Sequence, residues 1–195
     1  LHSTSRRQRQ MCIRDSAVAV YKMENNYRTG YNIVSFAMGF LKPVKNKIRK
    51  KVIPKNPNMG TLIERDTIDI PYIISEIMKE QDFGNWFILT RTNGQIEDVQ
   101  RSLRNFNIPS DTFKKSDLSN DELKDKMKQN TVKVLTVHSA KGLENEKVAV
   151  IGVNPVYDEE RRVAYVAATR AKNKLIWCYK NKKPYKKIVK TFNWE

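Results

Sequence analysis

The feature that most constrains the fold is a repeated switch, from Ala17 onward, between short apolar runs and segments with helical spacing of apolar residues. Runs suited to buried strands lie near residues 17–22, 61–65, 86–90, 132–137, 147–152 and 174–179, and helical patterns lie near 29–41, 69–80, 94–106, 119–128 and 158–171. Strands that alternate with helices in this way are typical of an α/β layer fold with a mostly parallel sheet.

The net charge of +16 constrains the partners. A hydrophobic content of 39% is too high for a disordered polycation, so the 195 residues are expected to form one folded basic domain. A charge of this size favours a polyanionic partner, with nucleic acid ahead of a membrane surface because no basic amphipathic helix is present. The alternative is that the charge serves only solubility.

Several classes of protein are excluded by the sequence. There is no run of 18 apolar residues and no signal-peptide pattern, so no membrane partner and a cytoplasmic location are expected. Two cysteines and two histidines, widely separated, are too few for a structural zinc site or a disulfide framework.

The chain divides into three parts. Residues 1–16 have no strand or helical period and resemble a translated cloning scar, so they are set aside. Residues 17–180 form the predicted domain, in which the Pro-containing and Lys-rich stretch 42–60 is expected to be a basic connector rather than an element. Residues 181–195 are expected to be a basic, solvated tail.

Four polar clusters carry the candidate chemistry. Three follow predicted strands, at residues 25–30, 90–95 and 136–144, and a fourth, residues 168–172, closes a helix. Ligands of open parallel sheets bind outside the carboxyl ends of the strands, so the four clusters are predicted to line one crevice.

These clusters resemble a known family. "MENNYRTGYNIVSFA" (23–37), "ILTRTNGQIEDVQRSLRNFNIP" (88–109), "TVHSAKGLE" (136–144) and "EERRVAYVAATRAK" (159–172) are similar, in this order, to four motifs of superfamily 1 helicases of the UvrD, PcrA and Rep type. The motifs belong to the second RecA-like motor domain of that family, and the resemblance covers Ala17 to about Tyr179. The implied fold is a RecA-like parallel sheet flanked by helices.

The chain also departs from the whole motor. It has no P-loop and no apolar strand that ends in Asp-Glu, which the family needs for phosphate and magnesium. The resemblance therefore implies ATP with Mg²⁺ in a site shared with an N-terminal RecA-like domain that is expected upstream and carries the magnesium ligands. The large accessory domain of the UvrD type is expected to be absent, because only about forty residues separate the "RTN" of the second motif (91–93) from the third motif.

The resemblance implies a nucleotide role for five residues. Arg28 and Arg170 correspond to arginine fingers, which stabilise charge on a transferring phosphate; the alternative is a surface or helix-capping arginine. Tyr27 corresponds to the ring that stacks on adenine, with half-buried packing as the alternative. Glu144 corresponds to the ribose contact, or is a solvated loop glutamate, and Gly142 lets the backbone approach closely.

The resemblance also implies contacts with single-stranded DNA. The residues concerned are Thr136, His138 and Ser139 of the third motif and Thr90, Arg91 and Asn93 of the second. The third motif would thus touch both DNA and nucleotide. The alternatives are a structural histidine at 138 and a helix N-cap at Asn93.

Two smaller predictions concern packing. Glu160 and Arg161 could form an ion pair that orients the helix that carries Arg170. Trp86 and Trp177 lie in strand runs and are expected in the core.

The favoured function is the second motor domain of an ATP-dependent DNA helicase, inactive by itself. The alternatives are a non-catalytic nucleic-acid-binding module derived from this fold and the motor part of a helicase-nuclease of the RecB or AddA kind.

Overall fold

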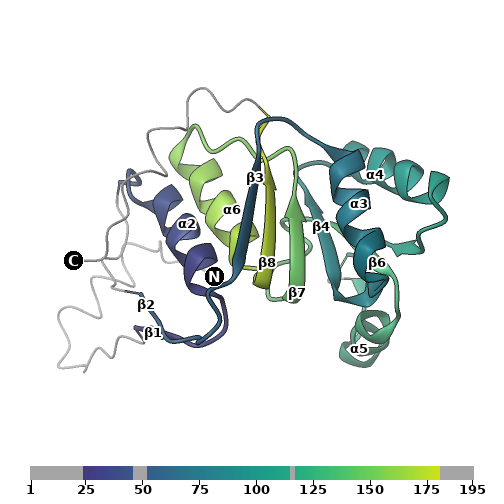
Figure 1. The fold of residues 1–195 in the computed structure, drawn as a ribbon, viewed down its shortest axis with the longest axis horizontal. Coiled ribbons are helices and arrows are strands. Elements are labelled where there is room, and N and C mark those ends of the chain that lie inside the picture. Colours follow the sequence, from purple (N-terminus) through teal and green to yellow (C-terminus); the bar gives the residue numbers. More distant parts are fainter. Residues whose placement is uncertain (1–23, 46–51, 115–116, 181–195) are drawn as a thin grey trace, which may run out of the picture.

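A six-stranded parallel sheet forms the centre of the molecule (Figure 1). The structure is a computed structural model that describes residues 24–45, 52–114 and 117–180. The strand order is β3-β8-β7-β4-β6-β5, and every strand pair of this sheet is parallel. The strands are β3 (Thr61–Arg65), β4 (Trp86–Thr90), β5 (Ser110–Asp111), β6 (Val132–Thr136), β7 (Asn145–Val150) and β8 (Ala171–Cys178). The predicted α/β class is confirmed.

The central strand β4 explains why the apolar runs are continuous. All five of its residues are buried. Phe87 and Leu89 contribute to one hydrophobic cluster, whereas Trp86 and Ile88 contribute to the other. Because neighbouring side chains of a strand point to opposite faces, a strand covered on both sides needs apolar residues at every position.

Helices cover both faces of the sheet (Figure 1). Helices α2 (Tyr31–Leu41) and α6 (Asp158–Ala168) pack on one face, and α3 (Ile70–Glu80) and α4 (Asn93–Asn105) on the other. Trp177 of β8 packs against Phe36 and Phe40 of α2, with ring centroids 5.4 and 4.9 Å away. Trp86 and Trp177 are both fully buried, so the prediction that they lie in the core is confirmed.

Two shorter helices complete the described chain. The 3₁₀ helix η1 (Phe83–Asn85) leads into β4. Helix α5 (Asn120–Lys128) begins with a capping box, in which the Ser119 hydroxyl accepts from the Glu122 amide and the Glu122 carboxylate accepts from the Ser119 amide. In the sequence, α5 lies between β5 and β6.

The stretch expected to be a connector has structure of its own. Its strand β2 (Ile53–Pro54) pairs in parallel with β1 (Asn25–Asn26), as a separate two-stranded sheet. The prediction that residues 42–60 contain no element is therefore wrong at Ile53–Pro54. We call residues 52–60 the strap. The predicted strand 17–22, the segment 1–16 and the tail 181–195 lie outside the described residues.

Within the described ranges, the helices are all too short or too polar to cross a lipid bilayer.

Candidate functional site

The candidate residues lie at two opposite edges of the sheet. Glu144 directly precedes β7 and Arg170 directly precedes β8, and Asn145 is in register with Ala171. Thr90 and Thr136 instead end β4 and β6, where they are in register with each other. We call the first group the amino-edge cluster (Tyr27, Arg28, Gly142, Glu144, Arg170) and the second the carboxyl-edge cluster (Thr90, Arg91, Asn93, Thr136, His138, Ser139).

The prediction of one crevice is wrong. A strand of five or six residues is about 17–20 Å long, so the sheet separates the two clusters by roughly that distance. The sequence pattern showed which residues flank the strands, but not that the chain enters β7 and β8 through polar segments at their amino ends.

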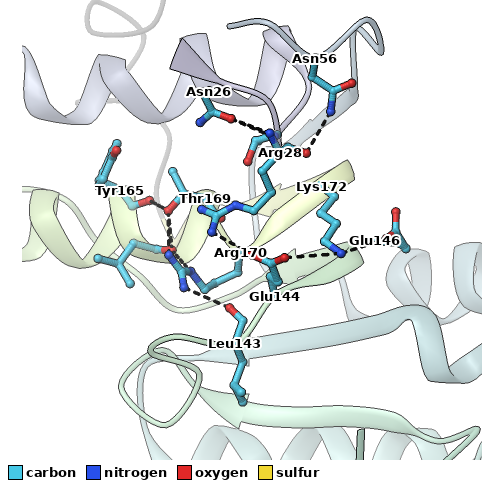
Figure 2. A network of polar contacts seen from close by, with 12 residues as sticks. Asn26, Arg28, Asn56, Leu143, Glu144, Glu146, Tyr165, Thr169, Arg170 and Lys172 are labelled. Carbon is cyan, nitrogen blue, oxygen red and sulfur yellow. Dashed lines mark hydrogen bonds and ion pairs between the residues drawn. The ribbon is translucent and has the colours of Figure 1, made fainter. Parts of the chain in front are cut away.

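Arg28 reaches across to the loop before β7 (Figure 2). Its Nη1 donates to Glu144 Oε2 at 2.8 Å, and its Nη2 donates to the carbonyl oxygen of Thr169 at 3.2 Å. The side chains of Arg28 and Glu144 are 41% and 36% exposed, so water screens this ion pair. Arg28 is therefore held in place but accessible to a ligand.

Arg170 lies beside Arg28, beneath the end of α6 (Figure 2). Its Nε donates to the carbonyl oxygen of Val166 at 3.0 Å, its Nη1 to that of Leu143 at 3.0 Å, and its Nη2 to the Thr169 hydroxyl at 3.3 Å. These bonds satisfy a carbonyl in the last turn of the helix and use three of the five guanidinium N–H groups. Burial lowers the pKa of Arg170, and the neighbouring charge of Arg28 lowers it further, while Glu144 opposes the shift.

Lys172 also belongs to this site, although the motifs implied no role for it. This lysine lies 3.5 Å from Glu144 Oε1 and 3.3 Å from Glu146 Oε1 (Figure 2). Glu144 is thus held between Arg28 and Lys172. The lysine belongs to the "ATRAK" cluster, but only the strand order, which places β8 beside β7, shows that it faces these carboxylates.

Tyr27 has an exposed ring. The residue is 69% exposed, and its hydroxyl accepts from Asn25 Nδ2 at 3.2 Å. Half-buried packing, the alternative raised from the sequence, is therefore wrong. Tyr27, Arg28 and Tyr165 of α6 line an open pocket of about 230 Å³ together with residues of β1.

The segment 137–144 connects the two edges of the sheet. It leaves the carboxyl end of β6 and enters the amino end of β7, with Val137, Ala140 and Leu143 buried in the cluster beneath α2 and α6. The Ala140 amide donates to the Thr136 carbonyl and the Leu143 amide to the Ala140 carbonyl, so every third residue faces the core. Gly142 has φ +82°, a left-handed conformation that favours glycine.

At the start of this segment, Thr136 and Ser139 form a local turn. The Thr136 hydroxyl donates to Ser139 Oγ at 3.0 Å and accepts from the Ser139 amide at 3.1 Å. His138 lies between them and is exposed. Thr90, in contrast, is fully buried, and its hydroxyl donates to the Thr92 carbonyl at 3.0 Å. The expected direct DNA contact by the Thr90 side chain does not fit this burial.

Two predictions about the second motif need correction. The N-cap of α4 is Thr92, not Asn93: Gln95 Oε1 accepts from the Thr92 amide and the Thr92 hydroxyl accepts from the Gln95 amide. Asn93 is the first helical residue and is exposed. A Thr three residues before Gln is the signature of a capping box, which the sequence already contained.

Glu160 pairs with Arg91, not with Arg161. Arg91 Nη2 and Nε both donate to Glu160 Oε1, at 2.7 and 3.1 Å, and this contact raises the pKa of Arg91. Arg161 instead pairs with Asp158 at 2.9 Å. Adjacent residues of a helix point to different sides, whereas residues three apart lie on one side, which explains the error.

In the part of the chain that the structure describes, no three His, Cys, Asp or Glu side chains are grouped so that they could hold a metal ion.

Comparisons with known proteins agree with the fold. Residues 111–182 match the UvrD-like helicase C-terminal domain family. The ATP-dependent DNA helicase Rep of Buchnera aphidicola (subsp. Acyrthosiphon pisum) is 27% identical over 177 residues, which cover 70% of this chain and 27% of that protein. A probable DNA helicase II homolog of Rickettsia felis is 28% identical over 200 residues, which cover 90% of this chain and 30% of that protein.

A solved structure resembles the whole fold. The C-terminal domain of a possible DNA helicase from Lactobacillus plantarum WCFS1 matches with a TM-score of 0.58 at 15% identity, over 86% of this chain and 94% of that chain. The fold is that of a helicase C-terminal RecA-like domain. Together with the sequence matches, it confirms the resemblance of the motifs to the C-terminal domain of UvrD-like superfamily 1 helicases. The chain spans less than a third of the length of these two curated relatives.

Proposed function

We propose that this chain is the second motor domain of an ATP-dependent DNA helicase, and that it completes an ATP site on a P-loop domain. One observation carries the proposal: Arg28 and Arg170, far apart in sequence, both donate to Thr169 at the amino edge of the sheet. Two guanidinium groups beside an exposed aromatic ring are suited to contact a nucleoside triphosphate that is bound to a second domain.

The residues of the amino-edge cluster fit ATP. Tyr27 offers an exposed ring for the adenine, and Glu144 offers a carboxylate for the ribose hydroxyls. Arg28 is 41% exposed and can turn from Glu144 toward a phosphate. Arg170 is held by backbone carbonyls, so its positive charge can stabilise a phosphate without movement of the side chain. ATP supplies the transferable γ-phosphoryl group, and we assign its Mg²⁺ ligands to the P-loop domain.

Positioned arginines of this kind accelerate phosphoryl transfer by about 10³ to 10⁵. The protein therefore needs both domains closed on one another for turnover. The isolated chain, which has no P-loop, is expected to be inactive.

The residues of the carboxyl-edge cluster other than the buried Thr90 are proposed to bind single-stranded DNA. His138, Ser139 and Asn93 offer donors near the surface, and the net charge of +16 favours phosphate. Arg91 can contribute only if it exchanges Glu160 for a phosphate. The segment 137–144 connects this cluster to Glu144, so movement at one edge can reach the other. A cytoplasmic location is part of the proposal.

Substitution of the two arginines tests this function in the chain joined to a P-loop domain of the same family. Arg28→Ala and Arg170→Ala are each expected to lower ATP hydrolysis by about 10³-fold or more while DNA binding changes little. A non-catalytic nucleic-acid-binding module predicts no difference in hydrolysis between the variants and the parent. Arg101→Ala, which removes an exposed arginine of α4, is the matched control.

A further inference from the structure

The strap, residues 52–60, holds the loop that presents Arg28. Its backbone is bonded to β1 and to the loop after it: the Ile53 amide donates to the Glu24 carbonyl at 2.8 Å, and the Lys55 amide to the Asn26 carbonyl at 2.7 Å. Further along, the Tyr31 and Asn32 amides donate to carbonyls of the strap. Residues 24–32 therefore take their position from a segment that no helicase motif of the sequence includes.

The strap contacts the Arg28 backbone directly through Asn56 (Figure 2). Asn56 Nδ2 donates to the carbonyl oxygen of Arg28 at 2.9 Å. Its Oδ1 accepts from the Asn58 amide at 2.9 Å, so the side chain is fixed at both ends. On the other side of the loop, Asn26 Oδ1 accepts from the amides of Arg28 and Thr29, each at 3.0 Å.

Alternate residues of the strap continue this attachment. Asn58 Nδ2 donates to Asn173 Oδ1 at 2.9 Å, next to Lys172, and Asn58 Oδ1 accepts from the Gly60 amide at 2.9 Å. The strap thus connects the backbone of Arg28 to the start of β8, where Arg170 and Lys172 lie. The positions of Arg28 and Arg170 are therefore both fixed relative to β8.

We propose that Asn56 is a positioning residue, which acts on nucleotide chemistry through Arg28. The inference rests on the proposed function, because it assigns Asn56 to the same site. A guanidinium that stabilises a transition state must be held to a fraction of an ångström, and a misplacement of about 1 Å can cost about 10²-fold in rate. With its main chain fixed by Asn56 and Asn26, the Arg28 side chain can leave Glu144 without displacing the loop.

Asn56→Asp isolates this contact. The carboxylate keeps the acceptor for the Asn58 amide but cannot donate to the Arg28 carbonyl. Asn56→Ala, which also removes the donor and adds no charge, is the second variant should the first destabilise the fold. Asn105→Asp, at the exposed end of α4, is the matched control for charge.

In the 195-residue chain, hydrogen exchange of the Arg28 and Thr29 amides is expected to accelerate about three- to tenfold in Asn56→Asp. Amides of β4 should stay unchanged. Unaltered exchange at Arg28 and Thr29 in both variants overturns the claim that Asn56 holds this loop.

In the chain joined to a P-loop domain, Asn56→Asp is expected to lower kcat for ATP by about 10-fold or more, with a smaller change in KM. The double variant Arg28→Ala, Asn56→Asp should hydrolyse ATP no more slowly than Arg28→Ala alone, because Asn56 acts only through Arg28. A further fall in the double variant contradicts the inference. Unchanged hydrolysis in Asn56→Asp while Arg28→Ala is inactive rejects the positioning role alone. Unchanged hydrolysis in Arg28→Ala rejects the proposed function itself.

Discussion

The close approach of Gly30 to Gly60 predicts that a single methyl group will separate the strap from the loop it holds. A Cβ on residue 30 would lie 2.6 Å from Gly60 Cα, 2.7 Å from Gly60 N and 3.0 Å from the Met59 carbonyl carbon. All three are backbone atoms, which cannot rotate away. Since carbon atoms pack at about 3.5–4.0 Å, the two segments must separate by about 1 Å.

This separation has a calculable cost. The bonds across this gap, from the Tyr31 amide to the Asn58 carbonyl, 3.4 Å, and from the Asn32 amide to the Met59 carbonyl, 2.8 Å, would lengthen beyond hydrogen-bonding range. At about 1 kcal/mol for each bond, Gly30→Ala should lower the free energy of unfolding by about 2 kcal/mol, within the usual range for overpacking.

The matched control is Gly94→Ala. No atom lies within 4 Å of a Cβ at this position, which is in the first turn of α4, so the substitution should raise stability by about 0.5 kcal/mol. Urea unfolding followed by circular dichroism measures both effects. A free energy of unfolding for Gly30→Ala within about 0.5 kcal/mol of the parent would show that the strap and the loop tolerate the added methyl group.

Two further predictions concern ion pairs. Glu76 is buried, and hydrogen bonds from Lys174 and Lys79 lower its pKa below the ordinary value of 4.5. The ionised Glu76 therefore stabilises the fold fully above pH 4.5, and this stabilisation is lost as the pH falls through the lowered pKa. Glu76→Gln should therefore cost about 2 kcal/mol at pH 7 and flatten the dependence of urea unfolding on pH between 6 and 3; an unchanged slope contradicts this. Glu160→Gln should cost about 1 kcal/mol in the same assay, because Arg91 loses a charged, two-donor contact, and the exposed neighbour Glu159→Gln should cost nearly nothing. Equal losses in the two variants would show that the Arg91 contact does not stabilise the fold.

The buried strands were the most predictable part of the fold. β4 begins and ends at the predicted residues, since a strand covered on both faces must be apolar and is bounded by polar residues. β3 also has the predicted bounds, although it is an edge strand and none of its residues is buried. β1 and β2 were not predicted because each has only two residues, too few to show a periodicity, and backbone hydrogen bonds join them.

The grouping of the candidate residues was predictable only in part. Arg28, Glu144 and Arg170 do lie together, as the motifs predicted. Their distance from Thr136 depends on the strand order and on the direction in which the chain enters β7 and β8, neither of which periodicity contains. The partner of Glu160 is likewise a tertiary contact, and Thr90 is buried because its strand is central.

The central claim is that this chain supplies one half of an ATP site. Its most direct test is ATP hydrolysis, with and without single-stranded DNA, by the 195-residue chain alone and by the chain joined to a P-loop domain of the same family. A shared ATP site predicts no hydrolysis above background for the chain alone and DNA-stimulated hydrolysis for the joined protein. Robust turnover by the chain alone would contradict it.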